Sequence, residues 1–218
     1  MQLIDGIKTR RSVRKFEDKK VPHEVLEQIV EAAAFAPSWK NSQTVRYIAV
    51  EDAALKERIA TEATMNFTHN KDIISACPVL IVVVTKTGIC GYEKDGSYTT
   101  SKKDKWEMFD AGIASQTFML AAHEYGVGTV TLGIFDEEIL GKILELPEGD
   151  NVSALLAAGY PESAPAAPKK KSVFPGADRF TFKTVCVILS FSKWPRKGGS
   201  RENKWIRKNG KRFTKRSA

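Results

Sequence analysis

The stretch DAGIASQTFMLAAHEYGVGTV, residues 110–130, decides the fold because it joins an apolar helix directly to a strand. We expect the helix to run from Asp104 to Tyr125 and to end at Gly126, a residue typical of the position after a helix C-terminus. Its interior is apolar on most sides, through Ala111, Ile113, Ala114, Phe118, Met119, Leu120, Ala121 and Ala122. Such a helix is buried, either centrally or in a subunit interface. A strand is expected to follow over 127–132.

The remaining elements alternate on both sides of this stretch, without an internal repeat. A short helix is expected near Leu3 and a longer one over 22–36, with Pro22 in its first turn. Asp52 and Asp136 are candidate N-caps of two further helices. The expected strands cover residues 45–50, 79–85 and 152–158. Residues 86–103 are predicted to form a mobile loop or lid, and 161–168 an extended arm.

Composition excludes several classes of protein. The chain has 218 residues, 42% of them hydrophobic, which suits one domain with or without an extension. No apolar run reaches the ~18 residues of a membrane helix, and the first 15 residues lack a signal-peptide centre. The three cysteines form no C-x-x-C pair and the three histidines lack metal-ligand spacing. We therefore expect a cytoplasmic protein without a metal site.

Charge is distributed unevenly along the chain. Residues 1–168 hold 18 Lys/Arg and 24 Asp/Glu, whereas residues 169–218 hold 16 Lys/Arg and 2 Asp/Glu. The overall charge of +8 is therefore a property of the C-terminal tail. The mildly acidic main part predicts no general affinity for nucleic acid.

Two short segments carry the strongest chemical signals. RRSVR, residues 10–14, places three guanidinium groups and a hydroxyl together, which suits a phosphate. APSWKNSQ, residues 36–43, follows a helix and offers amides and hydroxyls suited to the edge of a polar planar ring. Taken alone, each is also typical of a solvated surface segment.

Two later segments add to these signals. VTLGIF, residues 130–135, ends a strand on a glycine, which lets a flat ligand approach the backbone. PKKK, residues 168–171, is a second cationic cluster. A Rossmann fingerprint, a P-loop and the G-x-S-x-G and H-E-x-x-H motifs are all missing from the sequence.

The order of these segments resembles the nitroreductase family of FMN-dependent NAD(P)H oxidoreductases. The resemblance covers about residues 3–172 and rests on RRSVR, APSWKNSQ, the 110–130 stretch and AAGYPESAPAAPKKK at 157–171. It implies an α+β fold, with a mixed central sheet flanked by helices. It also implies a homodimer with FMN at the interface, and NADH or NADPH as electron donor.

The same resemblance implies a set of cofactor-binding residues. Arg10, Ser12 and Arg14, with Arg11 beside them, correspond to phosphate and ribityl contacts. The loop that reaches the flavin, often from the partner subunit, corresponds to Pro37, Ser38, Asn41 and Gln43. Lys71 corresponds to a residue near the pyrimidine edge that stabilises the reduced flavin electrostatically. Leu132 and Gly133 correspond to the backbone facing the ring, and Lys169 and Lys171 to late phosphate contacts.

The resemblance implies ping-pong electron transfer from NAD(P)H through FMN to a small organic acceptor such as a nitroaromatic or quinone, with no catalytic acid or base. Thr44 and Val45 replace the Pro and aromatic common in the family, which leaves the acceptor side open. Tyr92, Tyr98 and Trp106 are lid residues that could cover the site, and Trp39 could stack near the ring. The alternatives are a dehalogenase or flavin-consuming enzyme of the same fold, or a non-catalytic flavin- or nucleic-acid-binding protein.

The tail does not match the family's ending. We predict a flavin-binding domain over 1–172 and a basic extension over 173–218, with poor order from Ser192. A strand is conceivable over 180–191. Three interpretations stay open: an arm that wraps the partner subunit, a basic appendage that binds nucleic acid or anionic membrane, and a sequence without a selected function.

Overall fold

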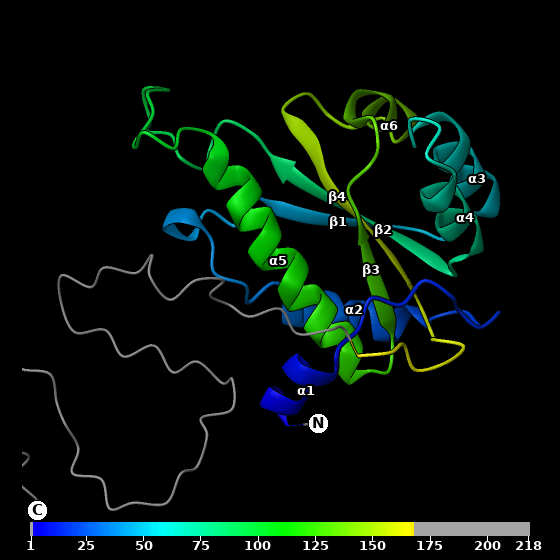
Figure 1. Ribbon diagram of the computed structural model, residues 1–218. Helices are drawn as coiled ribbons and strands as arrows, with labels where there is room; N and C mark the ends of the chain where they lie inside the picture. The colour runs from blue at the N-terminus through cyan, green and yellow to red at the C-terminus, as the bar shows by residue number, and fades with distance from the viewer. Residues whose placement is uncertain (1, 168–218) are drawn as a thin grey trace, which may run out of the picture. The chain divides into compact units, whose positions relative to one another are not determined.

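The computed structural model describes residues 2–167, which form a four-stranded sheet with helices on both faces (Figure 1). The strands are β1 (Val45–Val50), β2 (Val79–Lys86), β3 (Gly128–Leu132) and β4 (Asp150–Gly159). The helices are α1 (Leu3–Thr9), α2 (His23–Ala33), α3 (Ala53–Glu62), α4 (Thr68–Ala76), α5 (Lys105–Glu124) and α6 (Glu137–Ile143), with a short 3₁₀ turn, η1 (Trp39–Asn41). The tail over 173–218 and its predicted strand lie outside the described residues.

The strands follow the order β1-β2-β4-β3, so β1 and β3 are the two edges of the sheet. Within residues 2–167 all the strand pairings are antiparallel, whereas the resemblance implies a mixed sheet. The parallel component in this part of the chain is an isolated bridge between Ser12 and Thr129. The fold is therefore α+β, with one parallel contact placed at the β3 edge.

Strand β2 is the centre of the core because helices cover both of its faces. Leu80, Val82 and Val84 pack toward a cluster that includes residues of α3, α4 and α6. The alternate positions of the strand pack toward α2 and α5. Side chains of a strand point to opposite faces with a period of two, so a strand buried on both sides is a continuous apolar run. Figure 1 shows α5 crossing one face and α3, α4 and α6 grouped on the other side.

Most predicted elements are confirmed, with small shifts of their ends. Asp52 and Asp136 cap their helices, accepting from Leu55 N at 2.7 Å and Ile139 N at 3.0 Å. Helix α2 ends at Ala33, three residues before the predicted end, because the chain turns ahead of Pro37. Helix α4 was not predicted.

Helix α5 buries one face and exposes the other. Phe118 and Ala122 are fully buried against the sheet. Near the N-terminal end of α5 Met108 is 59% and Phe109 57% exposed, and α1, which contacts its C-terminal end, also exposes apolar side chains. Exposed apolar side chains that gather on one surface mark interaction sites. Among residues 2–167, α5 is therefore a central helix whose second face is left exposed.

Candidate functional site

The RRSVR segment lies along the N-terminal half of the edge strand β3. The Val13 amide donates to the Thr129 carbonyl at 3.0 Å, and Ser12 forms the parallel bridge to Thr129. Gly128 makes this approach possible, since a Cβ there would lie 2.5 Å from a Val13 methyl. Packing of Val13 into the core thus fixes the arginines beside β3.

The positive charge of this segment is not paired with carboxylates of the part of the chain that the structure describes. Arg11 donates to the backbone carbonyls of Lys8 and Arg10 at 2.7 and 2.8 Å. Within residues 2–167 the structure has no ion pair to Arg10, Arg11 or Arg14. The neighbouring Thr129 hydroxyl is buried and, in this part of the chain, without a hydrogen-bond partner. Guanidinium groups with free donors beside an unpaired hydroxyl fit a phosphate and its attached polyol.

At the other end of β3 the backbone is open to a ligand. Leu132 is buried, while Gly133 is exposed with open space where a side chain would project. Asn70 of α4, 5% exposed, donates from Nδ2 to the Ile134 carbonyl at 3.0 Å. The edge strand therefore connects the arginine segment to the Gly133 backbone, the two parts that the sequence assigns to phosphate and ring.

Lys71 points elsewhere. Its ammonium lies 3.7 Å from Glu57 Oε1 on α3, and its side chain is 43% exposed. The preceding residue, Asn70, is the one that reaches the Gly133–Ile134 backbone. The sequence analysis missed Asn70; a buried amide in an otherwise apolar helix face is the signal that identifies it.

The segment after Pro37 is a tight turn held by its own side chains. The Gln43 backbone N–H donates to Ser38 Oγ at 2.9 Å, and the Gln43 side chain donates from Nε2 to Asn41 Oδ1 at 3.0 Å. Lys40, Asn41 and Gln43 have positive φ angles of 44°, 55° and 50°. Non-glycine residues in this region are strained and persist only where surroundings fix them. The turn is therefore preorganised, and Gln43 Oε1 and Asn41 Nδ2 remain available to a ligand.

The two motifs do not meet within one chain. Thr9, next to the arginines, is hydrogen-bonded to His123 at the C-terminal end of α5 (2.9 Å), and Trp39 is hydrogen-bonded to Asp110 near its N-terminal end (2.7 Å). His123 lies thirteen residues after Asp110 in the sequence, which is about 20 Å along the helix at 1.5 Å per residue. Figure 1 shows α1 and the turn before β1 near opposite ends of α5.

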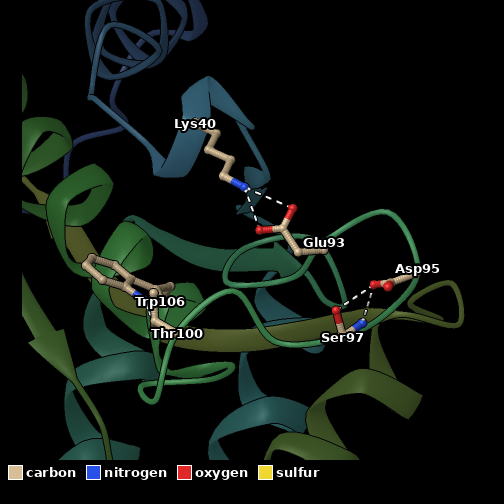
Figure 2. A network of polar contacts seen from close by, with 6 residues as sticks. All are labelled: Lys40, Glu93, Asp95, Ser97, Thr100 and Trp106. Atoms are coloured by element: carbon tan, nitrogen blue, oxygen red, sulfur yellow. Dashed lines mark hydrogen bonds and ion pairs between the residues drawn. The ribbon is translucent and has the colours of Figure 1, made fainter.

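The predicted lid, residues 86–103, begins at the last residue of β2 and otherwise corresponds to a hairpin over residues 87–104 next to this turn. Tyr92 and Tyr98 pair across it. Figure 2 shows its contacts: Lys40 Nζ lies 3.1 Å from Glu93 Oε1, and Trp106 Nε1 donates to Thr100 Oγ1 at 3.0 Å. Trp39, predicted to stack near the ring, contacts Trp106 with ring centroids 4.6 Å apart and ring planes tilted by 42°.

Between this turn, α2, β1 and α5 lies a cavity of about 330 Å³. Ala33, Ala34 and Ala114 form apolar walls, and Asp110 and Tyr47 add polar groups. Burial raises the pKa of Tyr47 to about 12, so this phenol stays protonated. Among residues 2–167 no group of three or more His, Cys, Asp or Glu side chains is placed to hold a metal ion.

A model described as the nitroreductase family matches residues 7–160. The chain belongs to the nitroreductase family. A nitroreductase family protein of Clostridium novyi NT has a solved structure that is 30% identical, with a TM-score of 0.65, and the match covers 74% of this chain and 86% of that one. An FMN-dependent nitroreductase of Clostridium difficile R20291 is 27% identical, with a TM-score of 0.62 and coverage of 76% and 91%. An NADH dehydrogenase of Thermus thermophilus is 29% identical over 70% of this chain and 83% of that protein.

The family match covers the arginine segment, the turn, the hairpin and β3 of this nitroreductase chain. Lys169 and Lys171, the other predicted phosphate contacts, lie outside the described residues. Across residues 2–167 the structure contains no helix long and apolar enough to cross a membrane.

Proposed function

We propose that this nitroreductase-family chain is an FMN-dependent oxidoreductase that takes electrons from NADH or NADPH. Bound FMN would accept two electrons from the donor and pass them to a small organic acceptor, such as a nitroaromatic or a quinone, in a ping-pong cycle. The observation that carries the proposal is the uncompensated arginine segment held against the open edge of β3. Family membership supports the same function.

In this proposal the edge of β3 is the cofactor's platform. Arg10, Arg11 and Arg14 hold the phosphate, and Ser12 and Thr129 supply hydroxyls to the polyol. The bare backbone at Gly133 lets a flat ring lie against the strand. Lys169 and Lys171 stay predictions as additional phosphate contacts.

The edge of the ring is better served by Asn70 than by Lys71. Asn70 already donates one Nδ2 hydrogen to the Ile134 carbonyl. The second Nδ2 hydrogen and the Oδ1 acceptor of its side chain can face a pyrimidine ring. The Lys71 ammonium would first have to leave Glu57. Exposed pairs of this kind contribute little, about 0–1 kcal/mol, so Lys71 stays a candidate whose role requires a rotamer change.

We infer that a second copy completes the site. The turn at 37–43 lies about 20 Å along α5 from the arginines of the same chain, so the two segments contact opposite ends of the helix within one copy. The exposed apolar faces of α5 and α1 supply a surface for pairing. In a homodimer with two-fold symmetry each turn would reach the β3 edge of the partner, giving two equal sites.

The proposal is tested with purified full-length protein incubated with FMN and then freed of excess cofactor. A flavin absorbance spectrum that bleaches when NADH or NADPH is added under argon, and returns when a nitroaromatic or quinone is added, is the expected result. Bleaching that a halogenated aromatic alone reverses would point to the dehalogenase alternative. Protein that stays colourless and retains no FMN would refute the proposal.

The tail is tested by truncation after Ser172. Should the truncated protein bind FMN and pair as the full chain does, the extension is dispensable to the enzyme. Loss of pairing would instead support an arm that wraps the partner.

A further inference from the structure

A buried carboxylate lies where the turn, the hairpin and α5 meet. Asp110, in the second turn of α5, is 3% exposed. Its Oδ2 accepts the Trp39 amide at 2.7 Å and the Cys90 thiol at 3.2 Å. A carboxylate removed from water is strongly destabilised unless donors replace the solvent. One donor comes from the turn and the other from the hairpin, so keeping Asp110 satisfied requires both segments to stay in place.

Cys90 extends this contact back to the turn. Its sulfur lies 3.3 Å from Ser42 Oγ and 3.1 Å from Thr44 Oγ1. Burial is the main cause that raises the pKa of the Cys90 thiol, so it remains a neutral donor to the carboxylate. Thr44 stands where the family often has proline, and its buried hydroxyl completes this cluster. The hydrogen bonds therefore join residues on both sides of the strained Lys40–Gln43 turn.

The other contacts between the turn and the hairpin are weaker. The Lys40–Glu93 pair has side chains 56% and 45% exposed, and such pairs contribute little in water. The Trp39–Trp106 contact, with ring planes tilted by 42°, acts through packing and carries no charged hydrogen bond. The hydrogen bond from the Trp39 amide to the charged Asp110 carboxylate is about twice as strong as a neutral one. It therefore dominates the placement of the turn.

We propose that Asp110 is a positioning residue that holds the 37–43 turn and the 87–104 hairpin in the arrangement that faces the flavin and the acceptor. The inference rests on the proposed function. Asp110 touches neither cofactor nor acceptor in this proposal; it acts by keeping the turn in one conformation. Both donors point at one oxygen, Oδ2. Exchange of the carboxylate for an amide removes the charge and leaves one neutral oxygen to accept from both donors.

The size of the effect follows from the population of the correctly placed turn. Replacing charge-assisted hydrogen bonds by neutral ones corresponds to a factor of about ten in that population. When only a tenth of the molecules are competent to bind, the apparent dissociation constant rises about tenfold while the bound complex reacts at its normal rate. We therefore expect Asp110→Asn to raise KM for the acceptor about tenfold, with kcat within about twofold of wild type.

The experiment measures steady-state kinetics of full-length protein at saturating FMN. Asp18→Asn is the matched control, since it is the same substitution at an exposed position outside the turn and the hairpin. Ile59→Val, in the core on the far side of the sheet, controls for loss of stability alone. The proposal requires that KM rise in Asp110→Asn only. An unchanged KM, or an equal rise in either control, overturns it.

Hydrogen exchange gives a second readout that does not need an active enzyme. Peptides covering 36–44 and 87–104 should exchange about tenfold faster in Asp110→Asn than in wild type. In both controls the exchange rates of these peptides should equal those of wild type. Equal exchange shows that Asp110 does not hold the turn and overturns the inference. Faster exchange in a protein that binds no FMN would refute the proposed function instead, so the two failures are distinguishable.

Discussion

Gly128 is the position where the structure makes the sharpest prediction about the cofactor site. A Cβ at this residue would lie 2.5 Å from Val13 Cγ2 and 2.8 Å from Val13 Cβ. Real Cβ atoms do not approach other carbon atoms this closely. Gly128→Ala must therefore push Val13 away from β3, and with it the arginine segment that Val13 anchors.

The magnitude follows from the packing around Val13. Val13 is 5% exposed and its backbone is hydrogen-bonded to Thr129, so it cannot move away freely. Overpacking a core by one methyl group typically costs about 1–3 kcal/mol. For a domain of this size that corresponds to a melting temperature lower by roughly 2–12 °C. Because the segment moves with Val13, FMN affinity should fall about tenfold or more.

Thermal unfolding of the apo protein and fluorescence titration with FMN measure the two effects. Gly141→Ala is the matched control, since a Cβ there meets open space within a helix and should leave stability equal or higher. Val13→Ala removes the two methyl groups, which are two of the three clashing atoms, and leaves only Val13 Cβ. The double variant Gly128→Ala/Val13→Ala should therefore be less destabilised than the sum of the single changes. Strict additivity, or full FMN affinity in Gly128→Ala, would refute this reasoning.

The remaining predictions concern single contacts. Arg14→Ala should weaken FMN binding about tenfold, and more at low salt. Lys71→Ala should change FMN binding less than threefold, because the Lys71 ammonium is paired with Glu57. An FMN titration at two ionic strengths in which both variants lose the same affinity would contradict this assignment. Asp136→Ala should lower the free energy of unfolding by about 1 kcal/mol through loss of the helix cap, and urea unfolding that shifts no midpoint would contradict it. Burial, then the two neighbouring arginines, lowers the pKa of His123 below 6.5, so the folded state takes up this proton less readily than the unfolded chain. Stability should therefore be complete above pH 6.5 and decrease as pH falls through it, and this part of the pH dependence of Tm should disappear in His123→Gln.

Much of the fold was predictable because local chemistry and tertiary packing agree. The apolar run of β2, the caps at Asp52 and Asp136, and the helix-to-strand stretch at 110–130 each define their element without help from distant residues. Helix α4 lacked such a signal, since its N-cap is Phe67, which gives no side-chain cap within the described residues. Helix α2 was predicted three residues too long because alanines continue to Ala36 although the backbone turns earlier.

The candidate site was predicted as a set of segments rather than as an arrangement. Sequence order selects the arginine segment and the 36–43 turn, but it contains no distance, and the structure places them near opposite ends of α5. The orientation of Lys71 toward Glu57 depends on how α4 packs on α3, which no local pattern encodes. Asp110 and Cys90 are twenty residues apart in the sequence and become neighbours only through folding.

The central claim is that one flavin site is built from the arginine segment of one copy and the turn of another. It is tested most directly by coexpressing two inactive variants, Arg10→Glu and Asn41→Arg, with different affinity tags and purifying the mixed dimer. A site shared between copies leaves one of the two sites with both segments intact, so the mixed dimer should have about half the wild-type activity. A mixed dimer that stays as inactive as its parents would show that both segments serve a site within one chain, and would contradict the account.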